Sequence, residues 1–150
     1  RALLRHIADL GWHVQVHDDL HRLPPVMAAI EDAGVITVID HFGRPEDADA
    51  VRGSAFDALL AAIRRGRTWV KISADFRLPS ASVAVAAFDR LLDAAGPGRL
   101  MWGSDWPFAG FEDSMSYAGA VRAYQALVPD AALRARIDRT GMDFYFPGAT

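Results

Sequence analysis

Four short apolar runs, repeated at similar intervals, constrain the fold of this chain more than any other feature. They are HVQVH (13–17), VITVIDH (35–41), TWVKIS (68–73) and LMWGSD (100–105). Their last residues lie 24, 32 and 32 residues apart, the length of a strand followed by a helix. The second run is apolar on both faces, which is typical of a parallel strand covered on both sides.

The segments between these runs carry apolar residues at helical spacing. We predict helices over residues 25–33, 54–65, 80–94, 114–127 and 131–139. Ser54 and Asp130 are expected to be N-caps, and the GPG at 96–98 is expected to end the third helix. A further helix precedes the first strand, and the aromatic tail FYFPGAT is expected to pack against the body. The order α-βα-βα-βα-βα-α predicts an α/β fold with a parallel sheet.

The length of the chain limits how this sheet can be completed. With 150 residues, 51% of them hydrophobic, the chain suffices for one domain with a core. A closed (β/α)8 barrel takes about 250 residues, so four βα units are either half of such a barrel or a small open sheet. The chain starts inside a helical pattern without a methionine, and we therefore expect an N-terminal truncation.

Composition excludes several functions. The net charge is −3 and the basic residues are scattered, so we expect no nucleic acid as a partner. There is no cysteine, which excludes disulfides, zinc knuckles and a thiol nucleophile. No apolar run approaches the ~20 residues of a membrane span. We therefore expect a cytoplasmic protein that does not bind membranes.

Polar side chains gather where the predicted strands end. His17, His41 and Asp105 end strands, and Arg44 and Arg77 follow in the loops. Sites in barrels and open α/β sheets form beyond the carboxyl ends of the strands. A carboxylate and an imidazole can activate one water and polarise a carbonyl, and two arginines can hold carboxylate groups. This set of residues suits hydrolysis of an acidic ester, lactone or amide.

Two further charged residues have a structural interpretation. Asp40 is best read as a buried carboxylate that pairs with a neighbouring strand or loop. Lys71 lies in an apolar strand, where it can extend its amine to water or pair with a carboxylate, with a Schiff-base lysine as the alternative.

The motifs VIDHFGRP, WVKISADFR and LMWGSDWP, in this order and spacing, resemble the amidohydrolase-related (amidohydrolase 2) family. Within it they are most similar to the 2-pyrone-4,6-dicarboxylate lactonase-like hydrolases, and GWHVQVH fits the same pattern. The resemblance implies that residues 1–150 are the C-terminal part of one TIM-barrel domain, with strands five to eight of the barrel.

The resemblance also implies roles for the residues at the strand ends. Asp105 would be the general base, and His41 would help polarise the scissile carbonyl. Arg44 and Arg77 would grip substrate carboxylates, and His17 would contact the substrate.

Two departures from the family pattern affect these roles. The family's His-x-His pair is not in this chain, and Phe108 stands where many relatives have Asn or His. We therefore predict no tightly bound metal in this chain, and leave open a divalent metal such as zinc in the full-length protein.

We therefore predict a lactonase-like hydrolase with a small anionic substrate. Two alternatives remain open. One is a metal-dependent decarboxylase on the same scaffold. The other is an inert half-barrel that covers its open edges by self-association, as a homodimer or with a missing N-terminal half.

Overall fold

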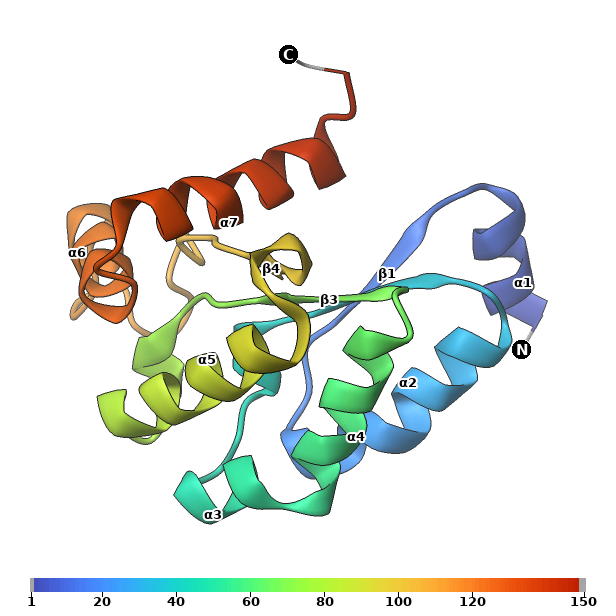
Figure 1. Ribbon diagram of the computed structural model, residues 1–150, viewed down its shortest axis with the longest axis horizontal. Coiled ribbons are helices and arrows are strands. Elements are labelled where there is room, and N and C mark those ends of the chain that lie inside the picture. Colours follow the sequence, from blue (N-terminus) through green and yellow to red (C-terminus); the bar gives the residue numbers. More distant parts are fainter. Residues whose placement is uncertain (1, 149–150) are drawn as a thin grey trace.

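A four-stranded parallel sheet forms the centre of the computed structural model, which describes residues 2–148 (Figure 1). The strands are β1 (His13–Val16), β2 (Ile36–Ile39), β3 (Thr68–Lys71) and β4 (Leu100–Met101). They lie in the order β1-β2-β3-β4, each parallel to its neighbour. All four predicted strands and their parallel pairing are confirmed.

Helices cover the sheet from two sides. The helices are α1 (Ala2–Asp9), α2 (Leu23–Asp32), α3 (Ala48–Arg52), α4 (Ser54–Arg64), α5 (Ala81–Ala95), α6 (Tyr117–Leu127) and α7 (Ala131–Tyr145). In Figure 1, α2, α4 and α5 lie along one side of the sheet, and α7 lies on the other side near β4. The crossovers thus bury the apolar strands that the sequence pattern predicted.

The main core lies between the sheet and the helices α4 and α5. Ile39, Val70 and Leu100 stand side by side on neighbouring strands, in register, and are fully buried. Leu59 of α4 and Leu91 of α5 belong to the same cluster and are also fully buried. Burial of these side chains, at roughly 25 cal/mol per Å² of apolar surface, stabilises the crossovers against the sheet.

Two local expectations about the helices are wrong, and one short helix was not predicted. Ser54 is the first residue of α4 and makes no capping hydrogen bond, because Gly53 occupies the N-cap position. The last helix, predicted over residues 131–139, continues to Tyr145. This helix packs against β4, and a Cβ added at Gly141 would lie 3.9 Å from the Cβ of Met101. Packing against β4 thus outweighs the ~1 kcal/mol that one glycine costs a helix. The short helix α3 was not predicted.

Other terminal features agree with the sequence. The Asp130 carboxylate accepts hydrogen bonds from the amides of Ala132 and Leu133, and Gly96 ends α5 with φ +64°. In the predicted aromatic tail, Phe144 packs 5.0 Å from the Trp69 ring, but Phe146 is exposed, and residues 149–150 lie outside the described part. Within residues 2–148, none of the helices has the length and apolar character needed to cross a membrane.

Candidate active site

The carboxyl ends of adjacent strands bring the predicted site residues to one edge of the sheet. His41 follows β2, Ser73 follows β3 and Asp105 follows β4. The backbone there is unusual, since His41, Ala74 and Asp105 all have φ between 50° and 64°. Left-handed conformations cost non-glycine residues about 1–2 kcal/mol each and cluster at functional sites. The strained backbone at this edge therefore sets the direction of the side chains that it carries.

The loop after β2 is the most strained of these segments. Residues 41–44 all have positive φ and form the 3-10 turn η2 (His41–Gly43) with Arg44 after it. Gly43 is required there, because a Cβ would lie 2.9 Å from Leu59 Cδ2 and its φ is +78°. The turn begins directly after β2 and holds the buried His41 ring at the carboxyl edge of the sheet.

His41 lies between a hydroxyl and a carboxylate. Its Nδ1 is 2.9 Å from Ser73 Oγ, and its Nε2 is 3.5 Å from Asp105 Oδ1. Burial lowers the pKa of His41, while the charges of Asp105 and Asp40 act in the opposite direction. A neutral ring carries one N–H, and a carboxylate can only accept. An Nε2–H directed at Asp105 therefore requires the Ser73 hydroxyl to donate to Nδ1.

Arg77, in the 3-10 turn η3 (Asp75–Arg77), is bound to Asp105. Its Nε donates to Asp105 Oδ2 at 2.6 Å, and its Nη2 donates to the carbonyl of Ala109 at 3.0 Å. The guanidinium carbon lies 5.3 Å and 5.0 Å from the rings of Phe76 and Phe111. The general base predicted from the sequence thus has a cation fixed at one oxygen.

His17 and Arg44 form the remaining part of the site. Arg44 Nη1 is 3.0 Å from His17 Nε2, and its Nη2 is 3.1 Å from Asp19 Oδ1. The His17 ring packs edge-on against the His41 ring with a centroid separation of 4.8 Å. All five predicted site residues are therefore linked by contacts that run from Arg44 through the two histidines to Asp105 and Arg77.

Residues that the sequence analysis did not assign to the site form a polar network next to it. Asp40 Oδ2 accepts from Gln15 Nε2 at 2.9 Å, and Lys71 Nζ lies 3.6 Å from Asp40 Oδ1 and 2.8 Å from Gln15 Oε1. The predicted pairing of Asp40 with a neighbouring strand, and of Lys71 with a carboxylate, is confirmed. Gln15 was missed, as was the role of Ser73. A polar residue between Val14 and Val16 was the only available signal for Gln15.

One cluster has the composition of a metal site. His17, Asp40 and His41 each place one ligand-type atom within 4.8 Å of the others, and Asp40 Oδ1 is buried without a hydrogen-bond partner. However, the Arg44 guanidinium lies on His17 Nε2 and the Lys71 ammonium faces Asp40. These two cations at the donor atoms would repel a metal ion. In addition, ligands that lie about 2.0 Å from a zinc ion are closer to one another than 4.8 Å. In this arrangement the cluster fits a divalent metal poorly.

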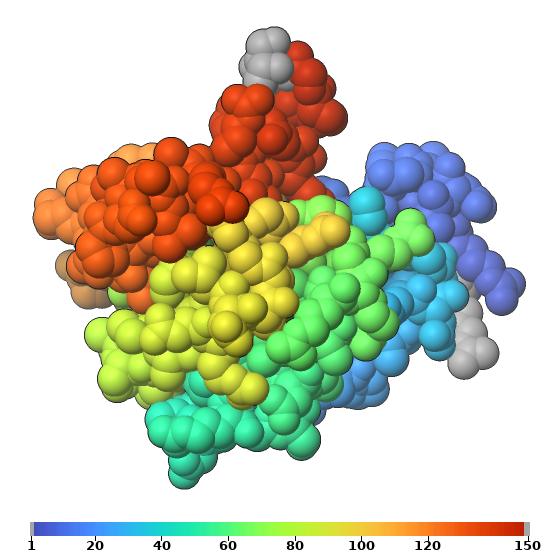
Figure 2. All heavy atoms as spheres, in the orientation of Figure 1, coloured from blue at the N-terminus to red at the C-terminus, as the bar shows by residue number. Residues whose placement is uncertain are grey.

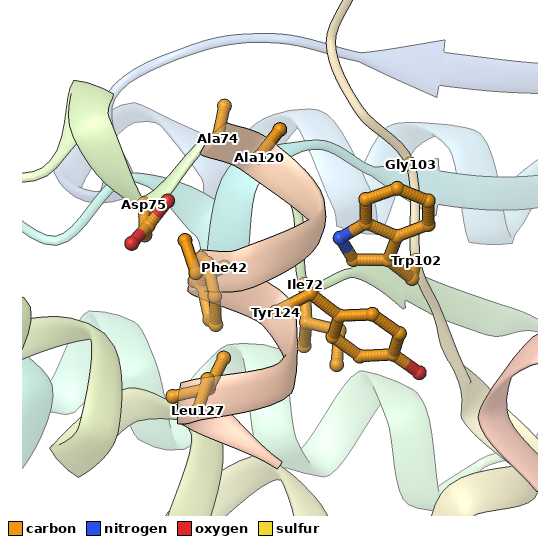
Figure 3. A pocket seen from close by; sticks show the side chains of 10 residues that line it. Phe42, Ile72, Ala74, Asp75, Trp102, Gly103, Ala120, Tyr124 and Leu127 are labelled. Carbon is orange, nitrogen blue, oxygen red and sulfur yellow. The ribbon is translucent and has the colours of Figure 1, made fainter. Parts of the chain in front are cut away.

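Two cavities among the described residues lie beside the site rather than in it. Figure 3 shows a small pocket under α6, where the Trp102 and Tyr124 rings stack at 4.9 Å next to Phe42 and Ile72. A larger hollow of about 420 Å³ lies at the amino ends of the strands, between His13, Trp69 and Phe144 of α7. In Figure 2 the α7 helix projects beside this region, apart from α1. Neither cavity is lined by His41, Asp105 or Arg77.

Comparison with known families gives one match that covers most of the chain. The model of a family described as amidohydrolase matches residues 1–139. A solved structure of a candidate 2-pyrone-4,6-dicarboxylic acid hydrolase from Pseudomonas putida superposes with a TM-score of 0.86 at 36% identity. It covers 93% of this chain and 54% of that one.

Two curated relatives have names that concern lactones. A 4-sulfomuconolactone hydrolase of Rhizobium radiobacter is 30% identical over 135 residues, which are 86% of this chain and 45% of the relative. A D-galactarolactone isomerase of Agrobacterium fabrum is 30% identical over 137 residues, 87% of this chain and 46% of the relative. The chain spans about half the length of these relatives. Its four strands correspond to half of a TIM-barrel fold, as predicted.

Proposed function

The chain belongs to the amidohydrolase family, and from this premise we propose that the protein carrying it opens a lactone or similar cyclic ester that bears carboxylate groups. One observation carries the proposal. An imidazole and a carboxylate that follow β2 and β4, His41 and Asp105, face each other at 3.5 Å at the carboxyl edge of the sheet. The lactone-related names of the two curated relatives support the same class of substrate.

In the proposed reaction, Asp105 accepts a proton from a water molecule as the water oxygen attacks the lactone carbonyl carbon. The neutral His41 ring donates its Nε2–H to the carbonyl oxygen, where negative charge develops. The ring C–O bond of the tetrahedral intermediate then breaks. The leaving oxygen takes the proton from Asp105, so that a hydroxy acid leaves and the carboxylate is restored.

The substrate's carboxylate needs a cation near this point. Of the two arginines predicted for this role, Arg44 suits it better, because its side chain is 36% exposed and its partners His17 and Asp19 are also accessible. Its planar fork can hold a carboxylate through two parallel hydrogen bonds. His17 then contacts the substrate between Arg44 and His41.

The activity is tested with the product of the complete reading frame that encodes this chain. Lactones with and without carboxylates are incubated with the enzyme, and ring opening is followed by proton release. We expect hydrolysis of the carboxylate-bearing lactones. Carbon dioxide release from aromatic acids without ring opening would contradict the proposal in favour of a decarboxylase, and interconversion of lactones without hydrolysis would favour an isomerase.

We also propose that the open edge of β1 is covered by another strand. Among residues 2–148, β1 pairs only with β2, and unpaired strand edges invite association. The exposed Leu10 and Trp12 lie just before this strand. Sedimentation of the isolated chain should show a mass that rises with concentration. A monomer at every concentration would contradict this expectation.

A further inference from the structure

We propose that Arg77 is a positioning residue for Asp105 and does not bind the carboxylate of the substrate. The functional part of this inference rests on the proposed role of Asp105 as general base. Its structural part is that the Arg77 guanidinium stays bound to Asp105 when an anion is present. This part can be tested without measuring turnover.

One of the two hydrogen-bonding edges of Arg77 is already occupied. Nε and Nη2 form one of the two edges with which a guanidinium grips a carboxylate bidentately. Here Nε donates to Asp105 Oδ2 at 2.6 Å, and Nη2 donates to the Ala109 carbonyl at 3.0 Å. A substrate carboxylate at this edge would have to displace both acceptors. It would also bring a second anion to a cation that Asp105 already neutralises.

The surroundings of the guanidinium hold it in this orientation. The rings of Phe76 and Phe111 lie within 5.3 Å of its central carbon and pack against each other at 5.0 Å. The Arg77 side chain is only 17% exposed, compared with 36% for Arg44. Cation–π contacts of a partly desolvated arginine are stabilising, so reorientation toward a ligand would lose them as well as the two hydrogen bonds.

This arrangement determines which oxygen of Asp105 is free to act. Oδ2 is held by Arg77, and Oδ1 faces His41 Nε2 at 3.5 Å. Asp105 itself has φ +64°, so its side chain is directed by a strained backbone and by one strong charge-assisted bond. Loss of Arg77 would leave the carboxylate free to rotate away from the attacking water.

The structural part is tested by NMR of the product of the complete reading frame, through the Nε–H signal of Arg77. The signal is assigned by its loss in Arg77→Lys. We expect Asp105→Asn to shift the Nε–H signal strongly. Citrate, an anion that is not a lactone and cannot react, should leave the signal in place. Arg44→Ala should weaken any binding of citrate. A signal that ignores Asp105→Asn, or that moves on addition of citrate, would overturn the assignment whether or not the protein hydrolyses lactones.

The functional part is tested by kinetics of the active enzyme, with Arg44→Ala as the matched control. For a carboxylate-bearing lactone, Arg77→Ala should lower kcat by about 10²-fold with little change in KM, and added guanidinium ion should restore part of kcat. Arg44→Ala should instead raise KM, and only for the charged lactone. A raised KM with unchanged kcat in Arg77→Ala would show that Arg77 binds the substrate and would overturn the inference. Arg77→Lys, which retains the charge but not the fork, should be impaired in kcat as well.

Discussion

His41 is buried and has two polar partners. Burial determines the charge of the ring, and the partners determine which nitrogen carries the proton. The ring is 4% exposed, with Ser73 at Nδ1 and Asp105 beyond Nε2. Because burial is the largest influence on its pKa, the ring is neutral at pH 7 and can present an N–H to a carbonyl oxygen. A neutral imidazole that donates from one nitrogen needs its other nitrogen satisfied, and Ser73 meets that need.

The lowered pKa of His41 predicts how folding stability depends on pH. The unfolded chain binds a proton at this residue more readily than the folded protein, whose pKa lies below the ordinary 6.5. Stability from this residue is therefore complete above about pH 6.5, declines as the pH falls toward the folded pKa, and is constant below it. Urea unfolding of the parent and of His41→Gln, between about pH 5 and 8, measures the difference.

The decline toward acid pH should be smaller in His41→Gln than in the parent. His13, whose pKa burial also lowers, remains in both proteins and cancels in the comparison. Equal pH dependence in the two proteins would show that His41 protonates as easily in the folded state as in the unfolded chain.

Ser73 should act on the reaction through His41. Ser73→Ala removes the partner of Nδ1 inside a buried site, which destabilises the fold by about 1 kcal/mol and leaves the ring free to adopt the wrong tautomer. We expect kcat to fall roughly 10-fold with little change in KM. Steady-state kinetics and urea unfolding measure the two effects. A variant with unchanged kcat would mean that the tautomer of His41 does not matter to the reaction.

At the scale of elements, helix caps provide a matched pair of variants. Asp130 accepts two amide hydrogen bonds at the start of α7, whereas Ser54 makes no capping bond at the start of α4. Asp130→Ala should therefore cost about 1 kcal/mol of unfolding free energy, while Ser54→Ala should be close to neutral. Denaturant unfolding of both variants tests this. A larger loss in Ser54→Ala would mean that α4 is capped as the sequence suggested.

A polar network joins three strands through Asp40. Lys71 on β3 and Gln15 on β1 both reach this carboxylate, which is 7% exposed. Lys71→Met should destabilise the protein by roughly 3 kcal/mol, because it leaves a buried carboxylate without its cation. The double variant with Asp40→Asn should recover much of this loss in urea unfolding. If the double variant is as unstable as Lys71→Met, the loss comes from packing rather than from the charge.

The sequence was most informative where periodicity and spacing agree. Apolar runs at βα intervals predicted all four strands, and the polar residues at their ends, such as His41 and Asp105, do meet. The motifs also identified the family correctly. The length of α7 was not predictable, because packing of this helix on β4 overrides the low helix propensity of Gly141. The pairing of Arg77 with Asp105 was not predictable either, because it depends on how two loops pack together.

At the scale of the whole molecule, the sheet brings together one candidate site residue from the end of each strand. His17 follows β1 and His41 follows β2. Ser73 follows β3 and Asp105 follows β4. The strained backbone lies at the same edge, while the larger hollow lies at the amino ends of the strands. The candidate site thus lies at the carboxyl ends of the strands, where the active sites of barrel enzymes form. We propose that Asp105, supported by His41 and Arg77, acts as the base at this edge.

The most direct test of that claim compares the parent enzyme with Asp105→Asn on a carboxylate-bearing lactone. Asparagine keeps the shape of the side chain but cannot accept the proton of the attacking water. We predict a loss of kcat of about 10²- to 10⁴-fold with KM nearly unchanged, measured as proton release on ring opening. A variant that opens the lactone at the rate of the parent enzyme would contradict the role of Asp105 and with it the proposed mechanism.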